Sequence, residues 1–353
     1  MGCPQTILRR MEPVREAGPV RLTRSCTGPA GGEARSTALA SCGRRGRRFF
    51  GSIGPGNTLM RMNHPVALKM PDGLTLRGAV WGKAVEPCVL LLHGFGQTRH
   101  AWDETASMLV DAGFYVLAID ARGHGESEHA ADGKYLLDHF VTDVREMLAT
   151  LPGRPAIIGA SLGGLAALLV EGESGESLTS ALVLVDITPR FEVAGVERIL
   201  AFMRAAPDGF PSLESAGQAI AEFLPHRRRQ RDTAGLVRYL DQDADGRWRW
   251  HWDPRMLSEE SRASAECHER FLAAAENVRV PVMLVSGKHS DVVSEETIDE
   301  FMSAVPHARH VVVDDAHHMV VGDSNNDFNE VIVDFMKNGT ASFSETRRQG
   351  GRP

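Results

Sequence analysis

The sequence has little cysteine and no long hydrophobic run. Only five of its 353 residues are cysteine, and three of them lie within the first fifty positions. No Cys-x-x-Cys pair occurs, so neither a disulfide framework nor a zinc site is indicated, and a reducing, cytoplasmic setting fits. No apolar run approaches the ~20 residues that span a bilayer. The net charge of −7 argues against non-specific binding of nucleic acid by the whole chain.

The first sixty residues differ from the rest in charge and composition. Residues 1–50 contain ten arginines and three glutamates with no lysine or aspartate, so they carry +7 and the remainder carries −14. They are rich in glycine, proline and serine without sustained periodicity, which predicts a disordered extension over residues 1–61. A transit peptide and an N-myristoylation signal at Met1-Gly2 are alternatives. We favour a non-native extension, with the start at Met60 or Met62.

Over residues 62–189 and 257–338, apolar strand-like runs alternate with segments of helical periodicity. This alternation predicts an α/β fold with a mostly parallel central sheet flanked by helices. A hairpin is expected over residues 66–80, turning at Pro71-Asp72-Gly73. Buried strands are expected at 87–92, 114–119, 156–158, 180–189, 280–286 and 308–313, helices at 100–112, 138–151, 295–305 and 323–337, and a disordered tail at 339–353.

Residues 190–256 interrupt this alternation. Pro189 ends regular structure, and helical spacing follows at 196–205, 213–224 and 234–240 without further strands. An insertion here would lie over the carboxyl edge of the sheet as a helical cap. Trp250 and Trp252 belong to an aromatic cluster in this segment. They either line a substrate pocket or pack the cap onto the core; we favour the packing role, and the pocket role stays open.

Residues 159–163 read Gly-Ala-Ser-Leu-Gly and join a predicted strand to a helix of small apolar residues. This G-x-S-x-G pattern predicts a nucleophile elbow, a turn so tight that the serine adopts a strained backbone conformation. The glycines beside Ser161 remove Cβ atoms that would collide across the turn. The following helix directs its free N–H groups at the serine. Taken alone, the pattern also fits a plain strand–turn–helix connection.

Two later residues complete a candidate catalytic set with Ser161. Asp291 and His318 each follow a predicted strand, so all three converge on one edge of the sheet. A serine hydroxyl becomes nucleophilic when a histidine takes its proton and a carboxylate orients that imidazole. We therefore assign Ser161 as nucleophile, His318 as base and Asp291 as the orienting acid. Asp186, which also ends a strand, is the alternative acid, and the adjacent His317 is the alternative base.

The segment His93-Gly94-Phe95-Gly96 follows the predicted strand at 87–92. In acyl-transfer enzymes of this architecture, that loop supplies one backbone donor of the oxyanion hole. The N–H groups of Phe95 and Leu162 are the expected pair, aimed at charge that develops in the transition state. Without the elbow the segment would be read as a tight turn. We expect His93 to shape this loop, and His124 to brace the glycine-rich segment at 120–127.

These segments together resemble the α/β-hydrolase superfamily, in its serine-nucleophile branch with a helical cap, over roughly residues 63–338. The family commonly ends with Gly-His-Met-Val, whose second residue is catalytic; this implies His318 as base, although His317 stands where glycine is common. Members with aspartate at the elbow are haloalkane dehalogenases and epoxide hydrolases, and Ser161 argues against both. The resemblance rests on residues 93–96, 120–125, 159–164, 290–293 and 317–320.

The sequence therefore predicts a serine hydrolase that cleaves a small to medium carboxylic ester or a related acyl compound. The chemistry needs no metal and no organic cofactor. Carbon–carbon bond hydrolysis and cofactor-free perhydrolase or haloperoxidase activity are alternatives on the same triad, because the fold does not choose among them. An alternative of another class is a non-catalytic protein of this fold that binds a small ligand. Neither a nucleic-acid partner nor a membrane span is expected.

Overall fold

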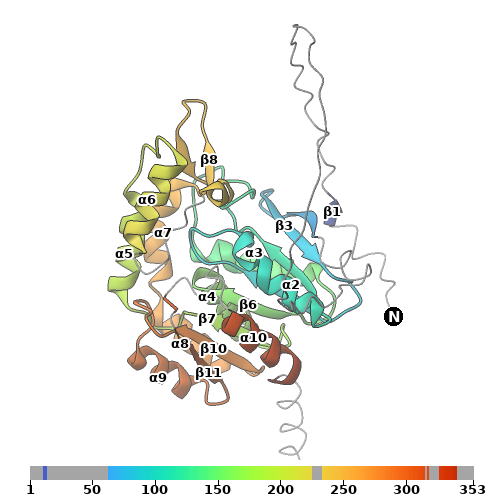
Figure 1. The fold of residues 1–353 in the computed structure, drawn as a ribbon. Coiled ribbons are helices and arrows are strands. Elements are labelled where there is room, and N and C mark those ends of the chain that lie inside the picture. The colour runs from blue at the N-terminus through green and yellow to red at the C-terminus, as the bar shows by residue number, and fades with distance from the viewer. Residues whose placement is uncertain (1–10, 14–62, 225–232, 315, 318–325, 340–353) are drawn as a thin grey trace, which may run out of the picture.

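The computed structural model describes residues 11–13, 63–224, 233–314, 316–317 and 326–339. Its centre is a nine-stranded sheet in the order β1-β2-β3-β5-β4-β6-β7-β10-β11 (Figure 1). The strand pairs from β5 through β11 are parallel, whereas the pairs β1–β2, β2–β3 and β3–β5 are antiparallel. The strands are β1 (Met11–Pro13), β2 (His64–Lys69), β3 (Thr75–Trp81), β4 (Cys88–Leu92), β5 (Tyr115–Ile119), β6 (Ala156–Ala160), β7 (Leu182–Val185), β10 (Val282–Gly287) and β11 (Arg309–Val313).

Helices cover both faces of this sheet. One face is packed by α3 (Leu137–Thr150), α4 (Leu162–Gly172), α8 (His268–Asn277) and α9 (Glu295–Ala304), and the other by α2 (Asp103–Asp111) and α10 (Asn326–Asp334). The central strand β4 shows why its sequence is apolar throughout. Leu90 and Leu92 pack into the first helical layer, whereas Val89 and Leu91 pack into the second. Successive side chains of a strand point to opposite faces of the sheet. Because helices cover both faces here, the strand needs an unbroken apolar run.

The strands and helices expected for the core are present, but the strand expected at 180–189 is shorter, Leu182–Val185, and residues 323–325 of the closing helix lie outside the described residues. The hairpin pairs β2 with β3 from His64↔Val80 to Lys69↔Thr75, and Asp72 stabilises its turn by accepting a bond from the Leu74 N–H at 3.1 Å. Two helix ends differ from the prediction. The helix expected at 100–112 begins as a 3-10 turn, Arg99–Trp102, and the closing helix ends in a π-helix, Phe335–Gly339.

The short strand β1 lies in the segment that the sequence predicts to be disordered. It pairs with β2 at the edge of the sheet, from Met11↔Leu68 to Pro13↔Val66. The rest of residues 1–61 lies outside the described residues, as do residues 340–353. Disorder in those two segments, and the site of the true start, therefore stay predictions.

The cap follows β7 and stands beside the sheet, with α5, α6 and β8 at the upper left of Figure 1. Its helical elements are α5 (Val193–Arg204), α6 (Leu213–Phe223), η3 (Ala234–Arg238) and η4 (Pro254–Leu257), and α7 (Glu259–Ala265) follows it. The prediction of helices alone was wrong, because β8 (Leu240–Gln242) and β9 (Trp248–Trp250) form an antiparallel hairpin. Its turn closes with an Asp243 N–H···O=C Arg247 bond of 2.9 Å, and Gly246 takes a positive φ of 79° that few other residues adopt.

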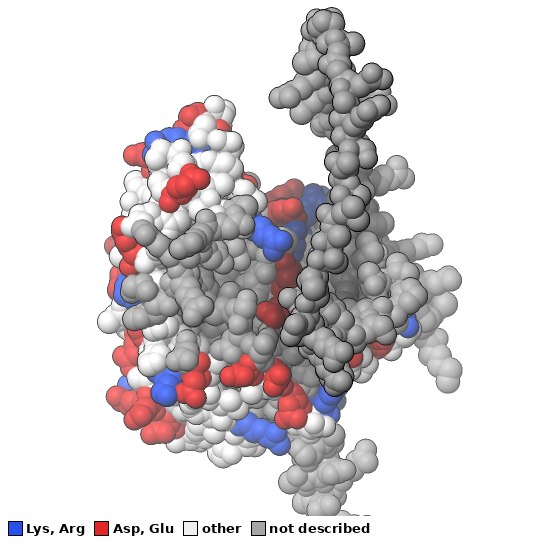
Figure 2. All heavy atoms as spheres, in the orientation of Figure 1, with Lys and Arg blue, Asp and Glu red and all other residues white. Residues whose placement is uncertain are grey.

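No helix among the described residues is long and apolar enough to cross a membrane. The same residues bring no three His, Cys, Asp or Glu side chains together as a metal site. On the face shown in Figure 2, acidic side chains gather near the lower edge of the molecule and over the cap, and the described basic side chains lie scattered among them.

Candidate active site

Ser161 occupies the junction between β6 and α4 in a strained conformation. Its φ is 45° and its ψ is −116°, and it is one of two described non-glycine residues with a positive φ. The turn is closed by tight packing: a Cβ on Gly159 would lie 2.6 Å from the Gly163 carbonyl oxygen, and one on Gly163 would lie 2.7 Å from the Leu92 carbonyl oxygen. Only glycine fits either position. The predicted elbow is present, with its serine at the N-terminus of α4.

The loop after β4 lies directly against this serine. A Cβ placed on Gly94 would be 3.2 Å from the Ser161 Cβ, so the loop and the elbow touch. Among the described residues, neither the Phe95 N–H nor the Leu162 N–H has a hydrogen-bond acceptor. The assignment of these two N–H groups to an oxyanion hole stays a prediction.

The two candidate acids have different surroundings. Asp186 is buried, with a φ of 51°, and its carboxylate accepts bonds from the Gly287 N–H at 2.8 Å and the Ser290 hydroxyl at 2.6 Å. The Ser290 oxygen in turn accepts the N–H groups of Val292 and Val293. Asp186 therefore holds the loop that carries Asp291.

Asp291 itself lines the same cavity as Ser161. Its Oδ2 accepts the Nε–H of Arg198, a cap residue on α5, at 2.5 Å. Cap and core meet closely here, because a Cβ on Gly195, one turn before Arg198, would overlap the Asp291 backbone. The side chains of Arg198 and Asp291 are 47% and 33% exposed, so this ion pair is shared with solvent.

The predicted base, His318, lies outside the described residues, and its assignment stays a prediction. The alternative base, His317, lines the cavity, where its Nδ1 donates to the His289 carbonyl at 3.1 Å. The rings of His289 and His317 lie 5.2 Å apart between centroids. This contact joins the loops that follow β10 and β11, the two loops that carry Asp291 and the histidine pair.

The cavity between cap and core has a volume of about 1920 Å³ and an aromatic wall. Trp250 and Trp252 stack at a centroid distance of 4.7 Å, and Phe202 stacks on Phe223 at 4.2 Å. Trp252 also approaches the loop after β4, since its ring lies 3.5 Å from the position of a Cβ on Gly96. Both tryptophans line the cavity and pack against the core, so the two roles foreseen for them are compatible.

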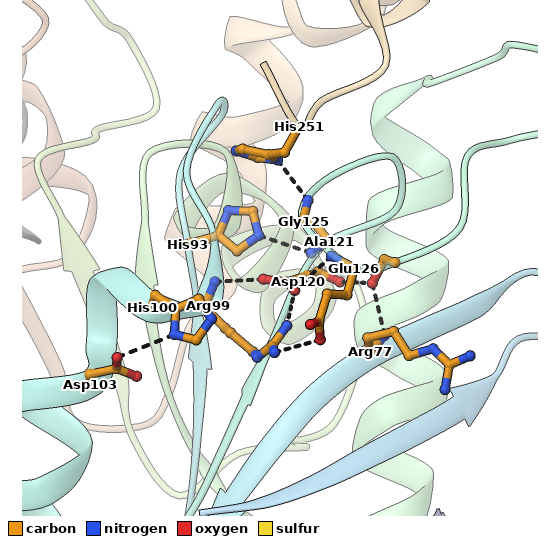
Figure 3. A network of polar contacts seen from close by, with 11 residues as sticks. Arg77, His93, Arg99, His100, Asp103, Asp120, Ala121, Gly125, Glu126 and His251 are labelled. Atoms are coloured by element: carbon orange, nitrogen blue, oxygen red, sulfur yellow. Dashed lines mark hydrogen bonds and ion pairs between the residues drawn. The ribbon is translucent and has the colours of Figure 1, made fainter. Parts of the chain in front are cut away.

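The loop after β4 is tied to the loop after β5 by an ion network in which Arg99 and Asp120 are buried and Glu126 is exposed (Figure 3). The Arg99 N–H donates to Asp120 at 2.7 Å, and its guanidinium bonds both Asp120 and Glu126. Burial disfavours the charged guanidinium, but the two carboxylates outweigh it and raise the pKa of Arg99 above its ordinary value. The same region holds His93, His124 and His251, all buried.

A family model described as "Alpha/beta hydrolase family" matches residues 89–331, more than half of the chain. The chain belongs to this family. Among its curated relatives, Esterase Rv0045c of Mycobacterium tuberculosis is 28% identical over 264 residues, covering 71% of this chain and 83% of the relative. A 3-hydroxybutyrate-oligomer hydrolase of Cupriavidus necator is 29% identical over 252 residues, covering 67% and 85%. The crystal structure of E-2-(acetamidomethylene)succinate hydrolase superposes with a TM-score of 0.68 at 22% identity, covering 78% of this chain and all of that one, which shows a shared fold.

Two residues beside the site of this α/β hydrolase were not assigned from sequence. The sequence places Arg198 only within a helical stretch, and nothing in its spacing points to Asp291. His251 lies between Trp250 and Trp252 in the sequence, and its neighbours give no sign of its role. The alternation Trp248-x-Trp250-x-Trp252 carries a strand signal that was available, and it places His251 on the opposite side of the chain from its aromatic neighbours.

Proposed function

We propose that this α/β hydrolase is a serine hydrolase that cleaves a small to medium carboxylic ester, or a related acyl compound, through an acyl-enzyme intermediate. One observation carries the proposal. Ser161 has a φ of 45° at the N-terminus of α4 and faces a cavity, with the Gly94 loop packed against it. Backbone strain of this kind costs free energy and persists where function requires it.

In the proposed reaction, the Ser161 hydroxyl oxygen attacks the substrate carbonyl carbon while His318 takes the hydroxyl proton. The N–H groups of Phe95 and Leu162 stabilise the oxyanion that forms. His318 then gives its proton to the leaving alcohol, which leaves the acyl group on Ser161. Water, deprotonated by His318, releases the acid and restores the serine. Asp291 orients His318 and stabilises its cation during both halves of the cycle.

The lining of the cavity favours a substrate with an uncharged, apolar acyl or alcohol group. Its lining includes Trp250, Trp252, Phe202 and Phe223, and Arg198, one of the four described arginines that line it, is paired with Asp291. The relatives named as an esterase and as a 3-hydroxybutyrate-oligomer hydrolase support ester cleavage. A charged group placed against the aromatic wall would lose hydration without an opposing charge.

The test is hydrolysis of p-nitrophenyl esters over a series of acyl chain lengths, with Ser161→Ala measured in parallel. We expect the variant to lose at least about 10³-fold in kcat/KM. Ser303→Ala is the matched control, because that hydroxyl is exposed on α9 and bonds only its own helix at Asp299. The preferred chain length measures the usable depth of the cavity.

Labelling with a fluorophosphonate probe separates the remaining alternatives. Folded wild-type protein that reacts at Ser161 but does not turn over esters points to carbon–carbon hydrolysis or perhydrolysis. A folded protein that neither reacts nor turns over substrate contradicts the enzyme assignment and favours a ligand-binding role.

A further inference from the structure

Three consecutive peptide groups of the loop after β4 are each held by a different histidine. The first is the peptide between Gly94 and Phe95, whose carbonyl oxygen accepts a bond from His93 Nδ1 at 2.8 Å. In a trans peptide the C=O and N–H groups point in opposite directions. Fixing the Gly94 carbonyl therefore also fixes the direction of the Phe95 N–H, the proposed oxyanion donor.

The next two peptide groups are held from farther along the chain. The Gly96 N–H donates to His124 Nε2 at 3.1 Å, and the Gly96 carbonyl accepts from His251 Nε2 at 3.3 Å. His93 ends β4 and His124 follows β5, so both belong to the core. His251 belongs to the cap, directly after β9.

The second ring nitrogen of each histidine also bonds the backbone. His93 Nε2 accepts the Ala121 N–H at 2.9 Å, His124 Nδ1 donates to the Arg122 carbonyl at 3.1 Å, and His251 Nδ1 accepts the Gly125 N–H at 2.6 Å. Figure 3 shows His93 and His251 both reaching the loop that follows Asp120. Each ring thus donates through one nitrogen and accepts through the other, which only neutral imidazole can do.

The surroundings of these rings agree with a neutral state. Burial lowers the pKa of His93 and of His124, and it lowers the pKa of His251 to about 4. His251 is 4% exposed, and its ring lies 5.9 Å from that of His124 and 5.3 Å from that of Trp252 between centroids.

We propose that His251 is a positioning residue through which the seated cap holds the oxyanion loop in its catalytic shape. The inference rests on the proposed function, because it gives the Gly94–Gly96 loop the task of stabilising an oxyanion. It goes beyond that function because the cap would then influence the rate of the chemical step as well as the choice of substrate. An apolar side chain would fill the same space; the imidazole instead bonds the backbone of two separate core loops with its two nitrogens.

Three substitutions separate the two bonds of His251. His251→Phe keeps an aromatic ring and loses both bonds. His251→Asn keeps an acceptor near the Nδ1 position, for Gly125, but does not reach Gly96. His251→Gln extends an amide donor toward the Gly96 carbonyl. We expect kcat for a p-nitrophenyl ester to fall about 10- to 100-fold in the Phe and Asn variants, less than the loss of a direct oxyanion donor, with KM within about threefold, and to recover largely in the Gln variant.

His129→Gln removes a neighbouring histidine whose side chain is 47% exposed and which does not contact the loop, and it should leave kcat unchanged. Equal losses of kcat in the Phe and Gln variants that track a fall in Tm would overturn the proposal, since a purely structural role predicts that result. Unchanged kcat in His251→Phe would overturn it as well.

Amide hydrogen exchange gives a readout that does not depend on ester turnover. In His251→Phe we expect faster exchange at the Gly96 and Gln97 amides, with unchanged exchange in the sheet strands. If wild-type protein cleaves no ester, the proposed function fails, and the exchange comparison still decides whether His251 holds the loop. Unchanged exchange at both amides counts against it.

Discussion

Arg198 of the cap helix α5 donates its Nε–H to Oδ2 of Asp291 at 2.5 Å, across the boundary between cap and core. The guanidinium also lies 4.6 Å above the Phe223 ring and bonds the Phe223 carbonyl, so its position is set from within the cap. A cationic group on the proposed acid reduces the negative charge that Asp291 presents to its histidine. The electrostatics of the proposed triad thus depend on a residue outside it.

Removing this cation should shift the pH dependence of the reaction. In Arg198→Gln, a protonated His318 would face a more negative Asp291, so the acidic limb of the kcat/KM profile should move to higher pH. Stability should change little, by about 1 kcal/mol or less, because the pair is partly exposed. Arg204→Gln, on the same helix and bonded to the Leu257 carbonyl, is the control. An unchanged profile would mean that the guanidinium does not influence the base.

The two candidate acids should respond in opposite ways to removal of their charge. Asp291→Asn should lower kcat by roughly three to four orders of magnitude with a small change in Tm, as expected when the imidazole loses its orienting carboxylate. Asp186→Asn should mainly lower the free energy of unfolding, by about 1–3 kcal/mol, because it weakens bonds to Gly287 and Ser290. Kinetics and urea unfolding on both variants check this. The reverse pattern would make Asp186 the catalytic acid.

The elbow should not tolerate a single added methyl group at Gly163. Gly163→Ala places a Cβ 2.7 Å from the Leu92 carbonyl oxygen and 2.8 Å from that of His93, so backbone must move. We expect a loss of about 1–3 kcal/mol in unfolding free energy, together with lost activity. Gly235→Ala is the matched control, since nothing lies within 4 Å of its Cβ position. Equal stability of the two variants would mean that the elbow relaxes easily.

The neutral histidines should make the fold sensitive to acid. Their folded pKa values lie below the ordinary value of 6.5, and that of His251 is about 4. Between these limits the unfolded chain binds protons that the folded chain does not, so stability falls as pH drops from about 6.5 toward 4. Each group contributes up to about 1 kcal/mol per pH unit. Urea unfolding at several pH values tests this, and His251→Gln should show a shallower slope than wild type.

The core and the elbow could be predicted from sequence because their causes are local. An unbroken apolar run such as that of β4 follows from burial on both faces, and the glycines around Ser161 follow from a turn that leaves no room for Cβ atoms. The cap was harder to predict. Residues 234–240 have helical spacing, yet the chain forms a 3-10 turn and then β8, because the Asp243–Gly246 turn lets Trp248–Trp250 pair back on it.

The contacts of the site depend on long-range packing that no spacing reveals. Arg198 meets Asp291, and His251 meets Gly96, across 93 and 155 residues of sequence respectively. The choice between Asp186 and Asp291 as the catalytic acid, which stays a prediction, depends on such long-range contacts as well. The place of Asp186 at the end of a strand is visible in the sequence, but its bond to Ser290, which fixes a separate loop, is not.

The placement of His251 bears on how such enzymes are re-engineered. Caps of α/β hydrolases are attractive units to exchange when a new substrate range is wanted, on the assumption that the core keeps its chemistry. Here residues 190–256 include His251, which hydrogen-bonds the Gly96 carbonyl. Replacing the cap therefore removes this hydrogen bond from the loop after β4. A chimaera that brings a histidine or glutamine to the same place should retain its turnover number, and one that does not should bind new substrates but process them slowly.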